Sequence, residues 1–198
     1  SLFLDVGANI SPKPYNLYQY ALMSYLYAKN VLKIENPAVG ILNVGEEPTK
    51  GDALRQKLFT LLSQEQHLNF VGNIEGHELF TGKADVIVTD GFSGNIVLKV
   101  SEGLGRSFKS IMLREINHSI SGKIGFFIAR NALVNYARKT DYAEYGGGVL
   151  LGVNGIVIVS HGRSSPKAIY NALALSKKIA ESSFFEQLKE FSKKWVQQ

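Results

Sequence analysis

Asp85-Val86-Ile87-Val88-Thr89-Asp90-Gly91-Phe92-Ser93-Gly94-Asn95 decides the fold, because an apolar run of strand length passes through a Gly-rich turn into a helical pattern. A strand, a turn and a helix in this order present backbone N–H groups and the positive end of a helix dipole. Both features suit an anion. The turn at residues 90–95 therefore predicts an anion-binding site.

The same arrangement recurs along the chain. Other apolar runs end in small polar loops at Gly7-Ala8-Asn9, Gly45-Glu46-Glu47, Gly72-Asn73 and His161-Gly162-Arg163-Ser164-Ser165. Strands separated by helix-length segments favour parallel pairing, and loops at the carboxyl edge of a parallel sheet bind ligands. We predict an α/β fold, a three-layer α/β/α sandwich with a mostly parallel sheet, and a phosphate-bearing ligand. We expect the 90–95 turn and the 161–165 loop to face each other.

The composition fits one α/β domain over residues 1–198. The chain has 198 residues, 45% of them hydrophobic, which is enough to bury a core. It has no cysteine, which excludes disulfides and a thiol nucleophile and fits a reducing cytosol. The net charge of +5 favours anionic partners, or is ordinary surface charge. The chain starts without Met in an expected strand, so we expect an upstream segment to be missing.

The segment from about residue 95 to 139 interrupts the alternation. It predicts a protruding helical hairpin, with helices over about 95–117 and 123–139 joined at residues 119–122. Its large apolar residues are Ile111, Met112, Ile116, Ile120, Ile124, Phe126, Phe127 and Ile128. An apolar hairpin needs cover, which the chain's own sheet, a second copy or a membrane surface could each supply. We favour a homodimer.

Motifs along nearly the whole chain resemble those of one known family. They are Leu4-Asp5-Val6-Gly7-Ala8-Asn9, Asn43-Val44-Gly45-Glu46-Glu47 with Lys50-Gly51, Phe70-Val71-Gly72-Asn73-Ile74-Glu75-Gly76, the 84–95 stretch with Lys99, Asp141-Tyr142 with Tyr145-Gly146-Gly147, Leu150-Leu151-Gly152, Gly155, and His161-Gly162. Together they resemble the PlsX-type phosphate acyltransferases of bacterial phospholipid synthesis. In the family an N-terminal segment precedes these motifs, so the chain resembles the C-terminal part of such a protein.

The resemblance implies a fold like that of the isocitrate/isopropylmalate dehydrogenases. It also implies acyl transfer from acyl-[acyl carrier protein] to inorganic phosphate, giving acyl phosphate in the cytoplasm without a cofactor. Acyl carrier protein and phosphate are then the expected partners, with peripheral membrane contact as a further expectation. If the missing segment completes the site, this chain alone should be much less active than the complete protein.

The chemistry of that reaction needs no protein nucleophile, because phosphate oxygen attacks the thioester. The protein must hold phosphate, stabilise the oxyanion and protonate the thiolate. The candidate catalytic residues are His161 as proton donor, Asn73 as amide donor, Lys99 as phosphate partner, and Asp90 as base or orienting group. The candidate phosphate- or substrate-binding residues are Asn9, Gly45, Lys50, Gly91, Ser93, Gly94, Asn95, Gly162 and Ser164. Taken singly, each Asn is explained equally well by turn formation and each Lys by solvation.

Two other classes of function stay open. A nucleotide-dependent dehydrogenase shares the fold group, although no Gly-x-Gly-x-x-Gly follows a strand. A non-enzymatic basic module could bind a membrane surface. Nucleic acid is disfavoured, because the aromatic residues belong to apolar helical faces and do not alternate with Lys and Arg. No clustered His, Asp and Glu spacing indicates a metal.

Overall fold

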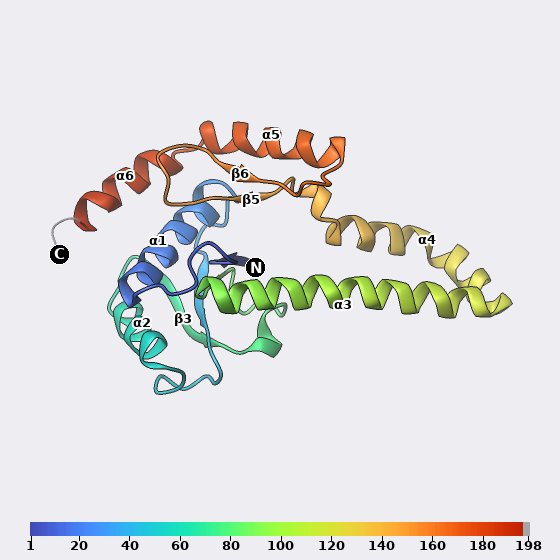
Figure 1. The fold of residues 1–198 in the computed structure, drawn as a ribbon, viewed down its shortest axis with the longest axis horizontal. Coiled ribbons are helices and arrows are strands. Elements are labelled where there is room, and N and C mark those ends of the chain that lie inside the picture. Colours follow the sequence, from blue (N-terminus) through green and yellow to red (C-terminus); the bar gives the residue numbers. More distant parts are fainter. Residues whose placement is uncertain (196–198) are drawn as a thin grey trace. The chain divides into compact units, whose positions relative to one another are not determined.

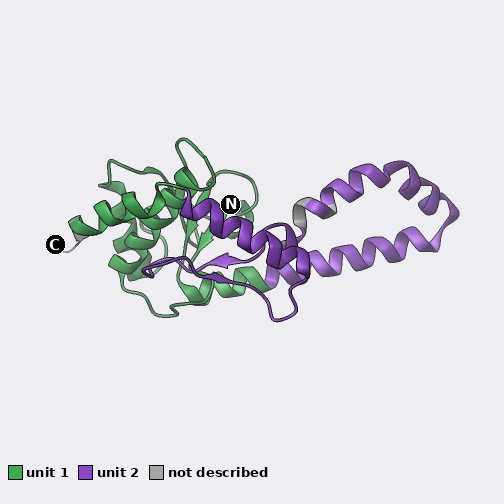
Figure 2. Ribbon diagram, turned by 90° about the horizontal axis from the view of Figure 1, so that it is seen from above, with its two compact units in different colours: residues 1–99, 182–198 green, residues 100–181 purple. Residues whose placement is uncertain are grey.

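A computed structural model describes residues 1–195, except for the side chains of residues 137, 139, 140, 142, 194 and 195 (Figure 1). The chain divides into two compact units (Figure 2). Unit 1 comprises Ser1–Lys99 and Ser182–Gln198, and unit 2 comprises Val100–Glu181. The single domain over 1–198 stays a prediction.

Unit 1 is built on a parallel sheet of four strands. These are β1 (Leu2–Leu4), β2 (Ala38–Leu42), β3 (Asn69–Ile74) and β4 (Val86–Val88), in the order β1-β4-β2-β3. Every neighbouring pair is parallel. The central strand β4 is buried along its whole length, as its unbroken apolar run predicts. The predicted α/β class with a parallel sheet is confirmed.

Helices cover this sheet. The helix α1 (Pro14–Asn30) begins with proline, whose fixed φ suits a first helical position, and it contacts β1, β4, α2 (Ala53–Ser63) and α6 (Phe184–Trp195). A hydrophobic cluster joins sheet residues to the segment around the short 3₁₀ helix η1 (Gly76–Glu78). Its buried members are Ile74, Leu79, Ala84 and Ile87, with Phe3, Leu42, Val71 and Val97 packed against them. The dehydrogenase-like three-layer sandwich stays a proposal.

Two long helices occupy the segment predicted to be a hairpin. The helix α3 (Gly91–His118) runs from unit 1 into unit 2, and α4 (Ile120–Thr140) follows it directly. The joint is shorter than predicted, because only Ser119 separates the helices. The hydroxyl of Ser119 caps α4 by accepting a hydrogen bond from the Gly122 N–H at 2.9 Å. Packing of the two helices as a hairpin stays a prediction.

The remainder of unit 2 corrects one expectation. The apolar character of residues 156–159 predicts a strand of the parallel sheet. Instead, β6 (Ile158–Val159) pairs antiparallel with β5 (Gly148–Val149) in a separate two-stranded sheet. The physical reason is local, since a Cβ on Gly147 would lie 2.6 Å from the Val159 carbonyl oxygen. Glycine thus lets the two backbones approach, and the strand pairs with its neighbour in sequence.

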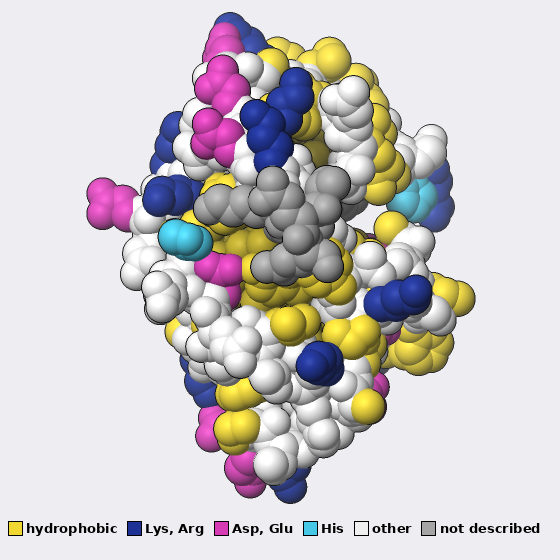
Figure 3. Space-filling model, turned by 90° about the vertical axis from the view of Figure 1, so that its left-hand side faces the viewer, with side chains coloured by type: hydrophobic (Ala, Val, Ile, Leu, Met, Phe, Trp, Pro, Cys, Tyr) yellow, Lys and Arg dark blue, Asp and Glu magenta, His cyan; other side chains and the backbone are white. Residues whose placement is uncertain are grey.

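Unit 2 also holds the 3₁₀ helix η2 (Tyr142–Glu144) and the helix α5 (Pro166–Ala180). They are tied together, because the Asn171 side chain donates to the Ala143 carbonyl at 2.8 Å and Lys167 pairs with Glu144 at 2.5 Å. Over residues 1–195, no helix combines the length and the apolar character needed to cross a bilayer. Figure 3 shows Lys and Arg side chains scattered among Asp and Glu on one face of the molecule.

Candidate functional site

The 90–95 turn is capped by its own carboxylate. One oxygen of Asp90 accepts a hydrogen bond from the Ser93 N–H at 2.8 Å, and the other accepts one from the Ser93 hydroxyl at 2.8 Å. The Gly94 N–H donates to the Asp90 carbonyl, and the Gly91 N–H donates to the Asn9 carbonyl, each at 2.9 Å. Three of the N–H groups that predicted an anion site therefore already have acceptors. An anion that binds at this turn would have to share these N–H groups with their present acceptors or displace those acceptors.

The turn after β1 packs directly on the start of α3. A Cβ on Gly91 would lie 2.6 Å from the Asn9 carbonyl oxygen, and one on Gly94 would lie 1.8 Å from the Asp5 carbonyl oxygen. Only glycine allows backbones this close. The structure thus brings together four predicted binding residues: Asn9, Gly91, Gly94 and Asn95.

Asp5 is not among the residues that the sequence predicted for the site. Its carboxylate is 4% exposed and accepts hydrogen bonds from the N–H groups of Gly7, Ala8 and Asn9 at 2.7–2.8 Å. An Asp that directly follows an apolar strand and lies two residues before Gly-Ala-Asn is the signal that would have found it, because Asp side chains often bond the backbone a few residues on. Asp5 therefore fixes the loop that carries Asn9.

Arg55 was not predicted either, and its guanidinium group contacts Asp52, Asp90, Ser93 and the Leu42 carbonyl. Its Nη2 atom lies 2.5 Å from an Asp90 oxygen and 3.1 Å from the Ser93 hydroxyl. Its Nη1 atom lies 2.7 Å from Asp52, and its Nε atom lies 3.2 Å from the Leu42 carbonyl. The sequence signalled only the spacing of Asp52 and Arg55 in one helical turn.

These contacts bear on the two roles predicted for Asp90, base or orienting group. Burial raises the pKa of its carboxyl, but the Ser93 hydrogen bonds and the Arg55 charge outweigh burial and hold the pKa below its ordinary value. A carboxylate whose oxygens are occupied and whose pKa is lowered is a weak base. The geometry therefore favours Asp90 as an orienting group.

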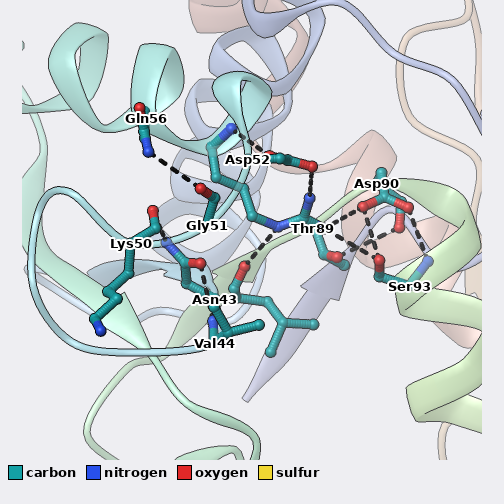
Figure 4. A network of polar contacts seen from close by, with 11 residues as sticks. Asn43, Val44, Lys50, Gly51, Asp52, Gln56, Thr89, Asp90 and Ser93 are labelled. Carbon is teal, nitrogen blue, oxygen red and sulfur yellow. Dashed lines mark hydrogen bonds and ion pairs between the residues drawn. The ribbon is translucent and has the colours of Figure 1, made fainter.

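The 45–51 loop is held by two buried asparagines, each at a strand end. The Asn73 amide, 3% exposed, donates to the carbonyls of Glu47 at 2.9 Å and Glu46 at 3.4 Å. The Asn43 amide donates to the Lys50 carbonyl at 3.1 Å (Figure 4). The NH2 group of Asn73 thus bonds the loop, which indicates that Asn73 positions it, while its Oδ1 atom is buried without a hydrogen-bond partner among the described residues. Gly45 is buried within it, and Lys50 is exposed.

Replacing Asn73 by alanine should therefore destabilise the protein. The change strips two loop carbonyls of a buried donor, which costs about 1–3 kcal/mol. Urea unfolding of the complete protein measures it. Asn69→Ala is the matched control, because Asn69 makes one exposed contact to the Asn36 carbonyl from the other end of β3. Equal destabilisation by both changes would refute the holding role.

The 161–165 loop lies in unit 2, after β6. His161 Nδ1 accepts a hydrogen bond from the Arg163 N–H at 3.1 Å, which places the proton of the neutral imidazole on Nε2. The Ser164 N–H donates to the His161 carbonyl at 2.9 Å, and Ser165 caps α5. Within the described part of the chain, the Ser164 hydroxyl is buried without a hydrogen-bond partner.

The remaining predicted residues lie at the surface. Gly162 is exposed, and a Cβ there would meet no atom within 4 Å. Lys99 is exposed on α3. The facing of the 161–165 loop and the 90–95 turn stays a prediction. Among the residues that the structure describes, no three His, Asp or Glu side chains gather as metal ligands would.

Comparisons with known proteins agree with one another. The model of a family described as "Fatty acid synthesis protein" matches residues 1–187. A phosphate acyltransferase of Thermodesulfovibrio yellowstonii is 44% identical over 189 residues, 96% of this chain and 54% of that protein. Those of Lawsonia intracellularis and Desulfitobacterium hafniense are each 48% identical, over 88% and 96% of this chain and 51% and 57% of their own lengths. The chain spans about half the length of the curated relatives it matches.

Proposed function

The chain belongs to the fatty acid synthesis protein family, and we propose on this premise that it forms part of a phosphate acyltransferase. The complete protein transfers an acyl group from acyl-[acyl carrier protein] to inorganic phosphate, and the acyl phosphate serves bacterial phospholipid synthesis. One observation carries the proposal: the family match over residues 1–187 spans every candidate site residue, from Asn9 to Ser164.

The reaction forms one bond and breaks one. A phosphate oxygen attacks the thioester carbonyl carbon, the carbon–sulfur bond breaks, and the thiolate leaves as a thiol after gaining a proton. The Nε2–H of His161 is our proton donor, because its Nδ1 atom already accepts a hydrogen bond. Lys50 and Lys99 are our phosphate partners. Asp90 and Asn73 orient the two loops that flank the phosphate.

The start of α3 offers a surface for the acyl chain. Phe92 is 61% exposed and Ile96 is 49% exposed, one turn apart on the same helix. Ile10, 69% exposed, follows Asn9, whose carbonyl is bonded to Gly91. Apolar side chains beside a polar turn suit a substrate with a hydrocarbon chain and a reactive carboxyl derivative. We place the acyl group here.

The two other classes of function are not favoured. The three relatives are named phosphate acyltransferases, and none of them carries a dehydrogenase name. Peripheral membrane contact and a cytoplasmic location remain part of the proposal.

Thiol release by the complete protein tests this function. With acyl-[acyl carrier protein] as substrate, we expect free thiol to appear only when inorganic phosphate is present, and to appear without nucleotide or added metal. The control omits phosphate and adds a nicotinamide cofactor. Release that needs the cofactor would favour the dehydrogenase class, and release that ignores phosphate would refute the proposal.

A further inference from the structure

One guanidinium group joins segments that lie far apart in the sequence. The Arg55 side chain, 15% exposed, starts in the first turn of α2. It donates to Asp90 and Ser93 at the start of α3, to Asp52 at the N-cap of α2, and to the carbonyl of Leu42 at the end of β2. These contacts use all three side-chain nitrogens. The guanidinium group of Arg55 therefore bonds groups of the protein itself and not a substrate anion.

Leu42 and Asp52 lie on either side of the 45–51 loop. The two loops that flank the proposed phosphate position are thus joined through one side chain. We propose that Arg55 is a positioning residue of the acyl-transfer site, which holds the ends of the 45–51 loop to the 90–95 turn. This proposal rests on the function proposed above. A displacement of reacting groups by roughly 1 Å costs about 100-fold in rate, so such a residue can matter without touching substrate.

Arg55 is also the positive charge beside a buried carboxylate. Asp90 is 7% exposed and pairs with Arg55, which also pairs with Asp52 at the N-cap of α2. Without Arg55, Asp90 would lose this ion-pair partner. Burial would then raise the pKa of Asp90, opposed only by the Ser93 hydrogen bonds. A variant without Arg55 should therefore lose the ionised form of Asp90 at a higher pH than the parent protein does.

The experiment compares Arg55→Met and Arg55→Lys with Lys57→Met in the complete protein. Lys57 is exposed on the same helix, so its replacement removes one charge without touching the network. We expect Arg55→Met to lower kcat/KM for acyl-[acyl carrier protein] about 100-fold near neutral pH. The loss should grow as the pH falls. Arg55→Lys should restore the pH profile without the full rate, because an ammonium lacks the planar fork. Lys57→Met should match the parent.

A loss that is the same at every pH, or a parental rate in Arg55→Met, would overturn the proposal. Urea unfolding against pH gives a readout that does not use the reaction. Because the folded-state pKa of Asp90 is lowered, the stabilisation from Arg55 is present above the unfolded carboxyl pKa of about 3.9 and is lost as the pH falls through the folded value. The stability difference between parent and Arg55→Met should therefore shrink below about pH 4.

The two proposals can fail separately. If the parent protein transfers no acyl group, the proposed function fails, and the unfolding measurement still decides whether Arg55 holds the ionised Asp90. A stability difference that is constant with pH would overturn the Arg55 contact, whatever the activity of the parent protein.

Discussion

Replacing Gly94 by alanine should cost the protein about 3 kcal/mol or more of folding stability. The added Cβ would lie 1.8 Å from the Asp5 carbonyl oxygen and 2.9 Å from the Thr89 methyl carbon. Asp5 cannot give way, because its N–H donates to the Thr89 carbonyl within the pairing of β1 with β4. The start of α3 would have to move away from the turn after β1. Urea unfolding and the yield of soluble protein measure the effect.

Gly103→Ala is the matched control on the same helix. A Cβ at Gly103 meets no atom within 4 Å, so alanine there should stabilise the helix by up to about 1 kcal/mol. The two substitutions add the same methyl group to the same helix and differ only in what it meets. Similar stabilities for both variants would show that the turn after β1 does not pack on α3.

Replacing both Phe126 and Phe127 by aspartate should convert a dimer into a monomer. We propose a homodimer through α3 and α4, whose exposed apolar side chains include Leu104 at 66%, Phe108 at 60%, Ile124 at 57% and Phe127 at 76%. Two carboxylates placed in such an apolar interface would be desolvated without partners, which is costly enough to prevent association. Light scattering of the complete protein measures the mass.

Asn131→Asp with Asn135→Asp is the control for added charge. It places two carboxylates at exposed positions of the same helix and removes no apolar side chain. We expect this variant to keep the mass of the parent. An unchanged dimer mass in the phenylalanine variant would place the interface elsewhere, and a monomeric parent would refute the dimer.

The sequence predicted the parts of the fold that local pattern determines. The buried run 86–88, the glycines after it and the helix that follows were all foreseen, because an apolar strand and a Gly-rich helix start each have a distinct pattern. The run at 156–159 has the same apolar character, and its pairing with β5 was not foreseen. Strand partners depend on which backbones can approach, and here Gly147 beside β5 allows an approach that the apolar pattern of β6 does not reveal.

The candidate site likewise has parts that the sequence predicted and parts that it did not. Asn9, Gly91, Gly94 and Asn95 lie together in the structure, where the turn after β1 packs on the start of α3, and their role in binding stays a prediction. Arg55 was not found, because a long side chain in a helix can reach any of several neighbours and no spacing reveals which. The use of the Asn73 amide by the 45–51 loop also depends on three-dimensional contact.

The most direct measurement uses phosphate labelled with ¹⁸O on every oxygen. The complete protein is given acyl-[acyl carrier protein] and this phosphate in unlabelled water, and the acyl product is identified by mass spectrometry. If phosphate itself attacks the thioester, the product is an acyl phosphate that retains all of the label, including the oxygen bonded to the carbonyl carbon. A free fatty acid without any ¹⁸O would show attack by water instead, and would contradict the proposed function.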